Sequence, residues 1–137
     1  MTRLQSVRAD DQLGELASAP PGEIDVAPLL GTWWATDKAT DSVVKLELAD
    51  HAGSFVVHAF GACTPAPCDW GERPAVPYAA TVGSRDAMAF SAVYDFGFME
   101  TLLAAYMKGG ILVLDTFNAF KDGSGRASYF TREFFHR

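Results

Sequence analysis

The sequence lacks long apolar runs and clusters of basic residues, and each absence excludes a class of protein. No apolar stretch approaches the roughly 18 residues that a transmembrane helix needs. Only 11 Lys and Arg stand against 17 Asp and Glu, so the formal net charge is -6. Because phosphate backbones are held through Lys and Arg, we expect no nucleic acid as a partner, and we expect no membrane.

Several sequence signatures of enzymes are also missing. There is no Gly-x-Ser-x-Gly elbow, no glycine-rich phosphate loop followed by Lys, no His-Glu-x-x-His and no dinucleotide fingerprint. The segment DGSGR is rich in glycine, but we expect it in a hairpin turn rather than between a strand and a helix. These absences disfavour hydrolase, kinase and nicotinamide-dependent chemistry, and we expect no cofactor.

The N-terminal region differs from the rest of the chain. Residues 1–28 contain ADDQLGELA, which is long enough for about two helical turns, and then SAPPGE, which breaks regular structure. We predict an arm over residues 1–28, partly helical or disordered, before one domain over residues 29–137. The first residues lack the basic start, apolar stretch and cleavage site of a secretory signal, so we expect a cytoplasmic protein.

From Leu29 onward the pattern predicts an all-β domain. Short segments rich in Val, Phe, Tyr, Thr and Trp alternate with Gly, Pro, Asp and Asn, as in an antiparallel sheet that closes into a barrel or sandwich. We predict eight strands, centred on GTWWAT, VVKLEL, SFVVHAF, AVPYAATV, AMAFSAVYDF, METLLAAYM, ILVLDTFNAF and ASYFTREFFHR. The sixth also fits a helical period, but Gly109 and Gly110 after it suit a two-residue hairpin and favour a strand. The predicted architecture is an eight-stranded antiparallel up-and-down barrel.

The distribution of apolar residues along these strands predicts a covered outer surface. The second strand alternates, with Val44, Leu46 and Leu48 on the face expected to form the core. Three others, SFVVHAF, AMAFSAVYDF and ILVLDTFNAF, are largely apolar on both faces. We therefore expect the N-terminal arm or a second subunit, as in a homodimer, to cover part of the barrel.

The two ends of this domain resemble the lipocalin and calycin arrangement. In that family a Gly-x-Trp lies at the closed end of an eight-stranded barrel, and an arginine of the last strand packs over the indole. LLGTWWATD and the last strand supply candidates for these positions, which the resemblance assigns to Gly31, Trp33 and Arg132. A guanidinium over an indole contributes about 0.5–2 kcal/mol.

A second motif, VHAFGACTPAPCDWGE, is similar to one in small, mostly uncharacterised bacterial proteins. Their pattern is His-x-aromatic-Gly-x-Cys-x-Pro-x-x-Cys-Asp-Trp-Gly, and the likeness extends over about residues 31–137. Those relatives often have His after the first cysteine and Asp before the second, where this chain has Thr64 and Pro67. The departure argues against a metal site in the loop, and the resemblance implies a shared fold without an established activity.

Cys63 and Cys68 are the only cysteines, and three interpretations of them stay open. They are spaced more widely than a thioredoxin-like Cys-x-x-Cys, and no second pair exists to complete a structural zinc site. A structural turn, disulfide-closed or reduced, is favoured over a redox-labile pair and over a metal site with His58 or Asp69. Trp70 is expected to fold back and plug one end of the barrel as a structural residue, and stacking on a ligand is the alternative.

Alternate residues of a barrel strand face the lumen, so polar residues that share an apolar face are candidates for a site. If Val56 and Phe60 face inward, His58 does too. This reasoning selects His58, Glu100, Tyr106 and Asp115 as candidate acid–base residues. The candidate ligand-binding wall residues are Trp33, Phe60, Tyr78, Phe90, Tyr94 and Phe117.

Two functions from different classes follow from this interpretation. The first is binding of a small, largely apolar molecule in the lumen. The second is a cofactor-free cyclase or isomerase of specialised, polyketide-like metabolism, in which one or two polar groups stabilise developing charge in the same cavity. A purely structural or interaction role is the third interpretation.

Overall fold

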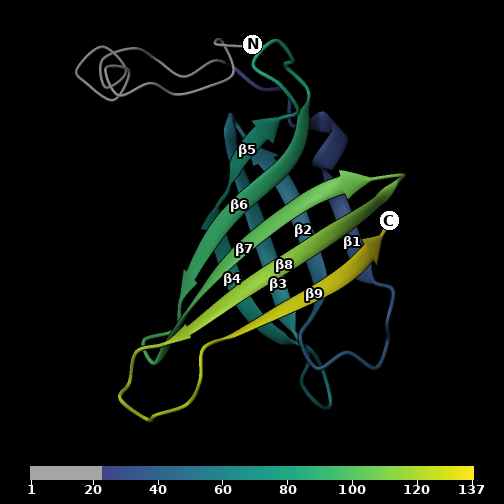
Figure 1. Cartoon of the computed structure of the whole chain (residues 1–137). Helices are drawn as coiled ribbons and strands as arrows, with labels where there is room; N and C mark the ends of the chain where they lie inside the picture. The colour runs from purple at the N-terminus through teal and green to yellow at the C-terminus, as the bar shows by residue number, and fades with distance from the viewer. Residues whose placement is uncertain (1–22) are drawn as a thin grey trace, which may run out of the picture.

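The computed structural model describes residues 23–137, which form one antiparallel up-and-down sheet of nine strands (Figure 1). The elements are η3 (Ala27–Leu29), β1 (Gly31–Ala35), β2 (Val43–His51), β3 (Ser54–Gly61), β4 (Cys68–Pro74), β5 (Val76–Ala79), β6 (Ala87–Asp95), β7 (Met99–Lys108), β8 (Ile111–Phe120) and β9 (Tyr129–His136). Their order in the sheet is β4-β3-β2-β1-β9-β8-β7-β6-β5. No helix in this part of the chain is long and apolar enough to span a membrane.

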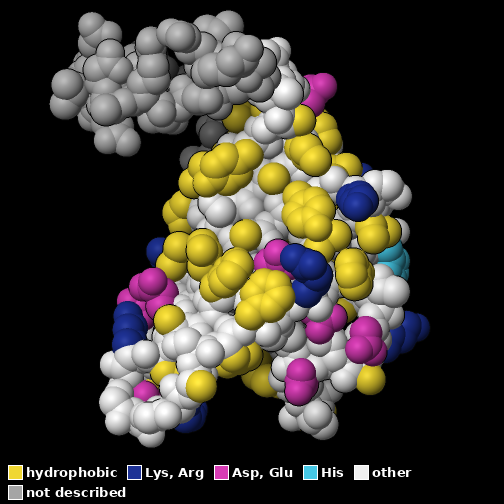
Figure 2. All heavy atoms as spheres, in the orientation of Figure 1, with side chains coloured by type: hydrophobic (Ala, Val, Ile, Leu, Met, Phe, Trp, Pro, Cys, Tyr) yellow, Lys and Arg dark blue, Asp and Glu magenta, His cyan; other side chains and the backbone are white. Residues whose placement is uncertain are grey.

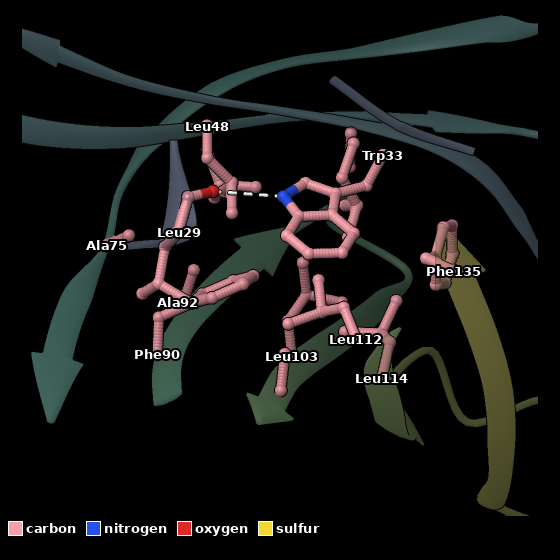
Figure 3. Packing of buried hydrophobic residues seen from close by; sticks show 14 of the residues in the cluster. Leu29, Trp33, Leu48, Ala75, Phe90, Ala92, Leu103, Leu112, Leu114 and Phe135 are labelled. Atoms are coloured by element: carbon pink, nitrogen blue, oxygen red, sulfur yellow. Dashed lines mark hydrogen bonds between the residues drawn. The ribbon is translucent and has the colours of Figure 1, made fainter. Parts of the chain in front are cut away.

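The sheet curls so that β6 to β9 lie across from β1 to β4, with the core between them (Figure 1). Alternate residues of each strand point inward, as the period of two requires. Trp33, Phe90, Tyr94 and Phe135 are the largest side chains in this core, and at most 2% of each is exposed. Figure 3 shows the indole of Trp33 among leucines from β7 and β8, so side chains fill this part of the interior.

The eight predicted strands are all present, and the structure adds a ninth that the prediction missed. β4 begins at Cys68, the second cysteine of the predicted structural turn, and it pairs with β3. Ala75 separates β4 from β5, and its backbone N–H donates to the carbonyl of Phe55. β5 pairs with β6 instead, so residues 68–79 form both edge strands of the sheet, β4 at one edge and β5 at the other.

The prediction of a strand for METLLAAYMK is confirmed as β7. Gly109 and Gly110 adopt φ of 60° and 87°, which only glycine adopts readily, and they connect β7 to β8 as a tight hairpin. The predicted faces of β2 need one correction. A bulge between Val43 and Lys45 buries Val43 completely and leaves Val44 half-buried outside the core.

The predicted arm lies mostly at residues 1–22, outside the described residues. Residues 23–28 pack against the sheet rather than standing apart from it. Asp25 forms a bridge with Asp86, and Ile24 and Val26 contact the core. Leu29, at the end of η3, is fully buried and accepts a hydrogen bond of 2.9 Å from the indole Nε1 of Trp33 (Figure 3).

The arginine over the Trp33 indole is Arg137, and the prediction of Arg132 was wrong. The register that pairs Trp34 with His136 brings Arg137 beside Trp33, and its guanidinium carbon lies 4.2 Å from the ring centre. Arg132 is five residues earlier in β9 and points away from the core. There it binds Asp115 through Nε and Nη2, at 2.7 and 2.9 Å.

Candidate functional site

A cleft lies at the end of the sheet opposite η3. It lies between the β1–β2 loop, residues 36–42, and the β3–β4 loop, residues 62–67, and it has a volume of about 760 Å³. Its walls are formed by Trp34, Ala35, Asp37, Lys38, Ala39, Thr40, Asp41, Val44, Ala62, Cys63, Thr64, Pro67 and His136. We call this hollow the open-end cleft.

A smaller pocket of about 170 Å³ lies next to the open-end cleft, inside the mouth of the sheet. The two share Asp41, Ala62 and Cys63 as wall residues. The other residues of the inner pocket are Ser42, Gly61, Cys68, Trp70, Met99, Thr116, Asn118 and Tyr129. The shared walls make the cleft and the pocket neighbouring parts of one candidate site.

The inner pocket borders a buried polar network on β7, β8 and β9. Thr101 Oγ1 donates to Asn118 Oδ1 at 2.6 Å, and Asn118 Nδ2 donates to Thr116 Oγ1 at 3.1 Å. Thr116 in turn bonds with Thr131, whose hydroxyl lies 3.3 Å from Ser42 Oγ. Buried polar groups are stable when they are satisfied in this way, and they give the mouth of the sheet a polar inner wall.

The spacing of polar residues along β8 is a sequence signal for this network. Thr116 and Asn118 share the face of β8 with Leu112 and Leu114, which are fully buried. The prediction instead followed Asp115, which shares its face with Val113 and Phe117. Both faces of β8 are apolar, so hydrophobicity alone did not distinguish the inner from the outer one.

Cys63 and Cys68 form a disulfide that closes the loop beside the cleft. This is the disulfide-closed form of the predicted structural turn. A disulfide is uncommon in the reducing cytosol, and the prediction of cytoplasmic residence stays untested. Among residues 23–137 no three His, Cys, Asp or Glu side chains are grouped to hold a metal ion.

Trp70 packs into the mouth of the sheet from β4. Its ring meets Tyr94 edge to face at 5.5 Å and Phe96 at 5.1 Å. Gly61 on β3 leaves the room for it, because a Cβ at that position would lie 2.7 Å from the indole nitrogen. The absence of a side chain at 61 therefore determines where this wall of the inner pocket lies.

His58 lies on the outer face of β3, so the prediction that it faces inward was wrong. Phe55, Val57 and Ala59 are the residues of β3 that point into the core. His58 Nε2 is 2.5 Å from Asp69 Oδ1, and its ring stacks on Phe60 at 4.4 Å. The hydrogen bond from His58, together with one from the Gly71 N–H, lowers the pKa of the Asp69 carboxyl.

The other three candidate acid–base residues also lie outside the core. Glu100 is exposed on β7, Tyr106 is half-buried on the outer face of the same strand, and Asp115 faces outward to its partner Arg132. Their strand neighbours Thr101, Ala105 and Leu114 point inward. The predicted cluster is therefore not brought together in the interior.

The predicted wall residues divide between the two faces. Trp33, Phe90 and Tyr94 point inward as expected, whereas Phe60 is half-buried on the outer face. Tyr78 and Phe117 are also outside, each with 47% of its surface exposed. None of these six lines the open-end cleft or the inner pocket.

Tyr94 connects three strands beside the inner pocket. At a bulge between His58 and Phe60, the Ala59 N–H donates to the phenol oxygen at 3.1 Å, and the phenol donates to the Gly71 carbonyl at 2.7 Å. Burial raises the pKa of Tyr94 to about 12, so the phenol stays protonated and can donate at neutral pH. Tyr94 therefore holds β6 against β3 and β4.

Comparison of the chain with protein-family models gives no match, and comparison with curated proteins and with solved structures gives none. The class that the structure defines is an all-β protein with a single nine-stranded antiparallel sheet. The family resemblances drawn from the sequence motifs stay predictions.

Proposed function

We propose that this protein binds a small, largely apolar molecule in the open-end cleft. The observation that carries the proposal is the volume of about 760 Å³, which lies within the roughly 300–1,000 Å³ of typical ligand sites. Trp34, Val44 and Pro67 supply apolar wall, whereas Asp37, Lys38 and His136 supply polar groups. These walls suit a ligand that has an apolar body and one polar or charged end. The proposed ligand site is therefore at the mouth of the sheet and not in the lumen expected from the sequence, where side chains pack together.

We further infer that the sheet acts as a closed, calycin-like barrel of eight strands. Counting β4 and β5 as one strand bent at Ala75 gives that number, because one half pairs with β3 and the other with β6. Two hydrogen bonds support closure between β4 and β6. Arg73 Nε donates to the Val93 carbonyl at 3.0 Å, and the Tyr94 phenol donates to the Gly71 carbonyl.

The cyclase or isomerase alternative has less support. An enzyme of that kind needs acid–base groups aimed at its substrate, and His58, Glu100, Tyr106 and Asp115 lie on the outer face. No described observation favours catalysis over binding, so binding is the function argued.

Trp34 makes the proposal testable, because its indole is 48% exposed and lines the cleft, while Trp33 is fully buried. Titration with anilinonaphthalene sulfonate and with lauric acid should quench tryptophan fluorescence saturably. Trp34→Phe should remove most of that change. Ala39→Phe places a ring in the cleft and should weaken binding about 10-fold or more, which calorimetry measures.

Two control variants make the test specific to the cleft. Ala127→Phe places the same ring in an exposed loop that does not line the cleft, and it should leave affinity unchanged. Phe117→Lys removes an exposed ring from the outer face and should also bind as the wild type does. Saturable binding that Ala39→Phe leaves intact, or an absence of binding by both probes, would reject the proposal.

A further inference from the structure

The two halves of the outer surface differ in chemistry. The outer face of β2, β3 and β4 carries charged and polar residues at alternate positions, namely Lys45, Glu47, His58, Asp69 and Glu72. The outer face of β5 to β9 is mostly apolar. Figure 2, seen from this side, shows hydrophobic side chains spread over it. We call this second surface the apolar face.

The strand register arranges the apolar face in three rows. One row runs Val93, Leu102, Phe117, Phe130 across β6 to β9. A second, starting on β5, runs Tyr78, Ala89, Tyr106, Val113, Phe134. The row between them runs Val76, Ser91, Ala104, Asp115, Arg132. Apolar side chains therefore surround one charged pair on both sides.

The apolar face is large enough for a specific interface. Its exposed members Val76, Tyr78, Val93, Leu102, Phe117, Phe130 and Phe134 each keep 39–52% of their surface accessible. Four of the seven are aromatic side chains of about 150–250 Å² each, so at about half exposure they present roughly 300–500 Å², to which Val76, Val93 and Leu102 add. A standard interface buries roughly 800 Å² per partner, so the aromatic side chains alone supply about half of it, and the other residues of the three rows add area.

The charges of the apolar face suit a second copy of the same chain. Asp115 and Arg132 neutralise one another through two hydrogen bonds, of 2.7 and 2.9 Å, so the centre of the face has no net charge. Two copies of a chain with net charge -6 repel one another over most of their surfaces. The neutral centre of the apolar face adds nothing to that repulsion, and burial of its apolar side chains favours contact there.

We propose that the apolar face is the interface of a homodimer in which the same surface of both copies meets about a two-fold axis. Such an isologous contact buries Phe117 and Phe130, whose rings already lie 5.2 Å apart within one chain. It also places the Asp115–Arg132 pair of each copy in the central row, where the pairs can exchange partners across the axis. The interface is separate from the open-end cleft and does not depend on the proposed ligand.

Sedimentation velocity of the full chain over a range of concentrations tests the dimer. The wild type should shift from monomer to dimer as concentration rises. Phe117→Lys and Phe130→Lys each place a charge in the interface and should raise the dissociation constant about 30-fold or more. Both positions are about half exposed, so the monomer should still fold.

Phe98→Lys is the matched control, because Phe98 is 45% exposed in the turn between β6 and β7, outside the three rows. It should dimerise as the wild type does. Circular dichroism checks folding, and Leu102→Ser replaces any lysine variant that fails it. A wild type that stays monomeric up to about 1 mM would overturn the proposal and leave the face to a different partner. A dimer that these variants do not weaken would overturn it as well.

Discussion

Arg137 lies over Trp33, with the guanidinium carbon 4.2 Å from the centre of the indole ring. The same guanidinium donates from Nη1 to the carbonyls of Pro28 and Leu30, at 3.1 and 3.0 Å. The end of β9 is thereby joined to Pro28 within η3 and to Leu30, which lies just before β1. Gly31 lies beside this arginine and has a φ of 124°, a backbone conformation that residues with side chains rarely adopt.

Arg137→Met should lower the free energy of unfolding by about 1–3 kcal/mol, because it removes the cation–π contact and two hydrogen bonds to backbone carbonyls. Urea denaturation at a fixed protein concentration measures the loss. Arg85→Met is the control, since within residues 23–137 the side chain of Arg85 makes one long hydrogen bond, of 3.4 Å, to the Glu23 carbonyl. Equal losses in the two variants would show that Arg137 has no special role.

Tyr94→Phe should cost about 1–3 kcal/mol of stability, because the Ala59 N–H and the Gly71 carbonyl lose their partner in a buried place. Tyr78→Phe removes an exposed hydroxyl that bonds Ser91 Oγ, and it should cost less than about 0.5 kcal/mol. Urea denaturation of both variants makes the comparison. A loss in Tyr94→Phe no larger than in Tyr78→Phe would contradict this account.

The pKa of Tyr94 also predicts a dependence of stability on pH. The folded-state pKa is raised to about 12, whereas the unfolded phenol ionises near its ordinary value of 10.0. Above pH 10 the unfolded state loses this proton and the folded state does not, so stability falls as pH rises toward 12. The slope should be smaller in Tyr94→Phe when both proteins are denatured with urea across this range.

The strands were predictable from the sequence because β-branched and aromatic runs alternate with turn residues. β4 was missed because CDWGERP is polar and ends in proline, and most of its residues are exposed. Which face of each strand points into the core was harder to predict. In β3 both Val56 and Val57 are apolar, yet only Val57 is buried in the core. On the outer face the Phe60 ring is covered by the side chains of Lys45 and His58, and not by a second layer of structure.

The candidate site depends on contacts that no local pattern reveals. The bulge in β4 opposite Ala59 changes which residues pair, and the loop closed by Cys63 and Cys68 forms a cleft wall only beside the β1–β2 loop. The sequence does not show whether Arg132 or Arg137 reaches the indole, because the register of β9 against β1 is a tertiary property. Residue identity predicted the arginine–indole contact but not which arginine makes it.

The Asp69 carboxyl should titrate below its ordinary pKa of 3.8, because His58 and the Gly71 N–H hydrogen-bond its charged form. In His58→Gln the pKa should rise toward 3.8, which carboxyl carbon shifts in an NMR titration will follow. A lowered folded-state pKa means that this stabilisation is present above the unfolded pKa and is lost as pH falls.

Asp95 is the control for that titration, since its pKa is lowered by Lys121, whose Nζ lies 2.8 Å away. The pKa of Asp95 should not change in His58→Gln. If Asp69 titrates alike in wild type and variant, the hydrogen bond with His58 is not what lowers its pKa.

Gly61→Ala should destabilise the protein by about 1–3 kcal/mol, because the new methyl group would overlap the indole of Trp70 and force it out of place. Gly83→Ala is the matched control, since the nearest atom to a Cβ there is Thr81 Oγ1 at 4.0 Å. Urea denaturation gives the stability, and near-ultraviolet circular dichroism reports on the packing of Trp70 against Tyr94 and Phe96.

A double-mutant cycle with Trp70→Leu separates a clash with the indole from a general effect of the added methyl group. Leucine lacks the ring atoms that approach Gly61, so Gly61→Ala should cost less in the Trp70→Leu background than in the wild type. The Trp70 ring also lines the inner pocket, so displacing it should change the pocket as well as the stability. An equal cost in both backgrounds would show that the space at Gly61 is not reserved for Trp70.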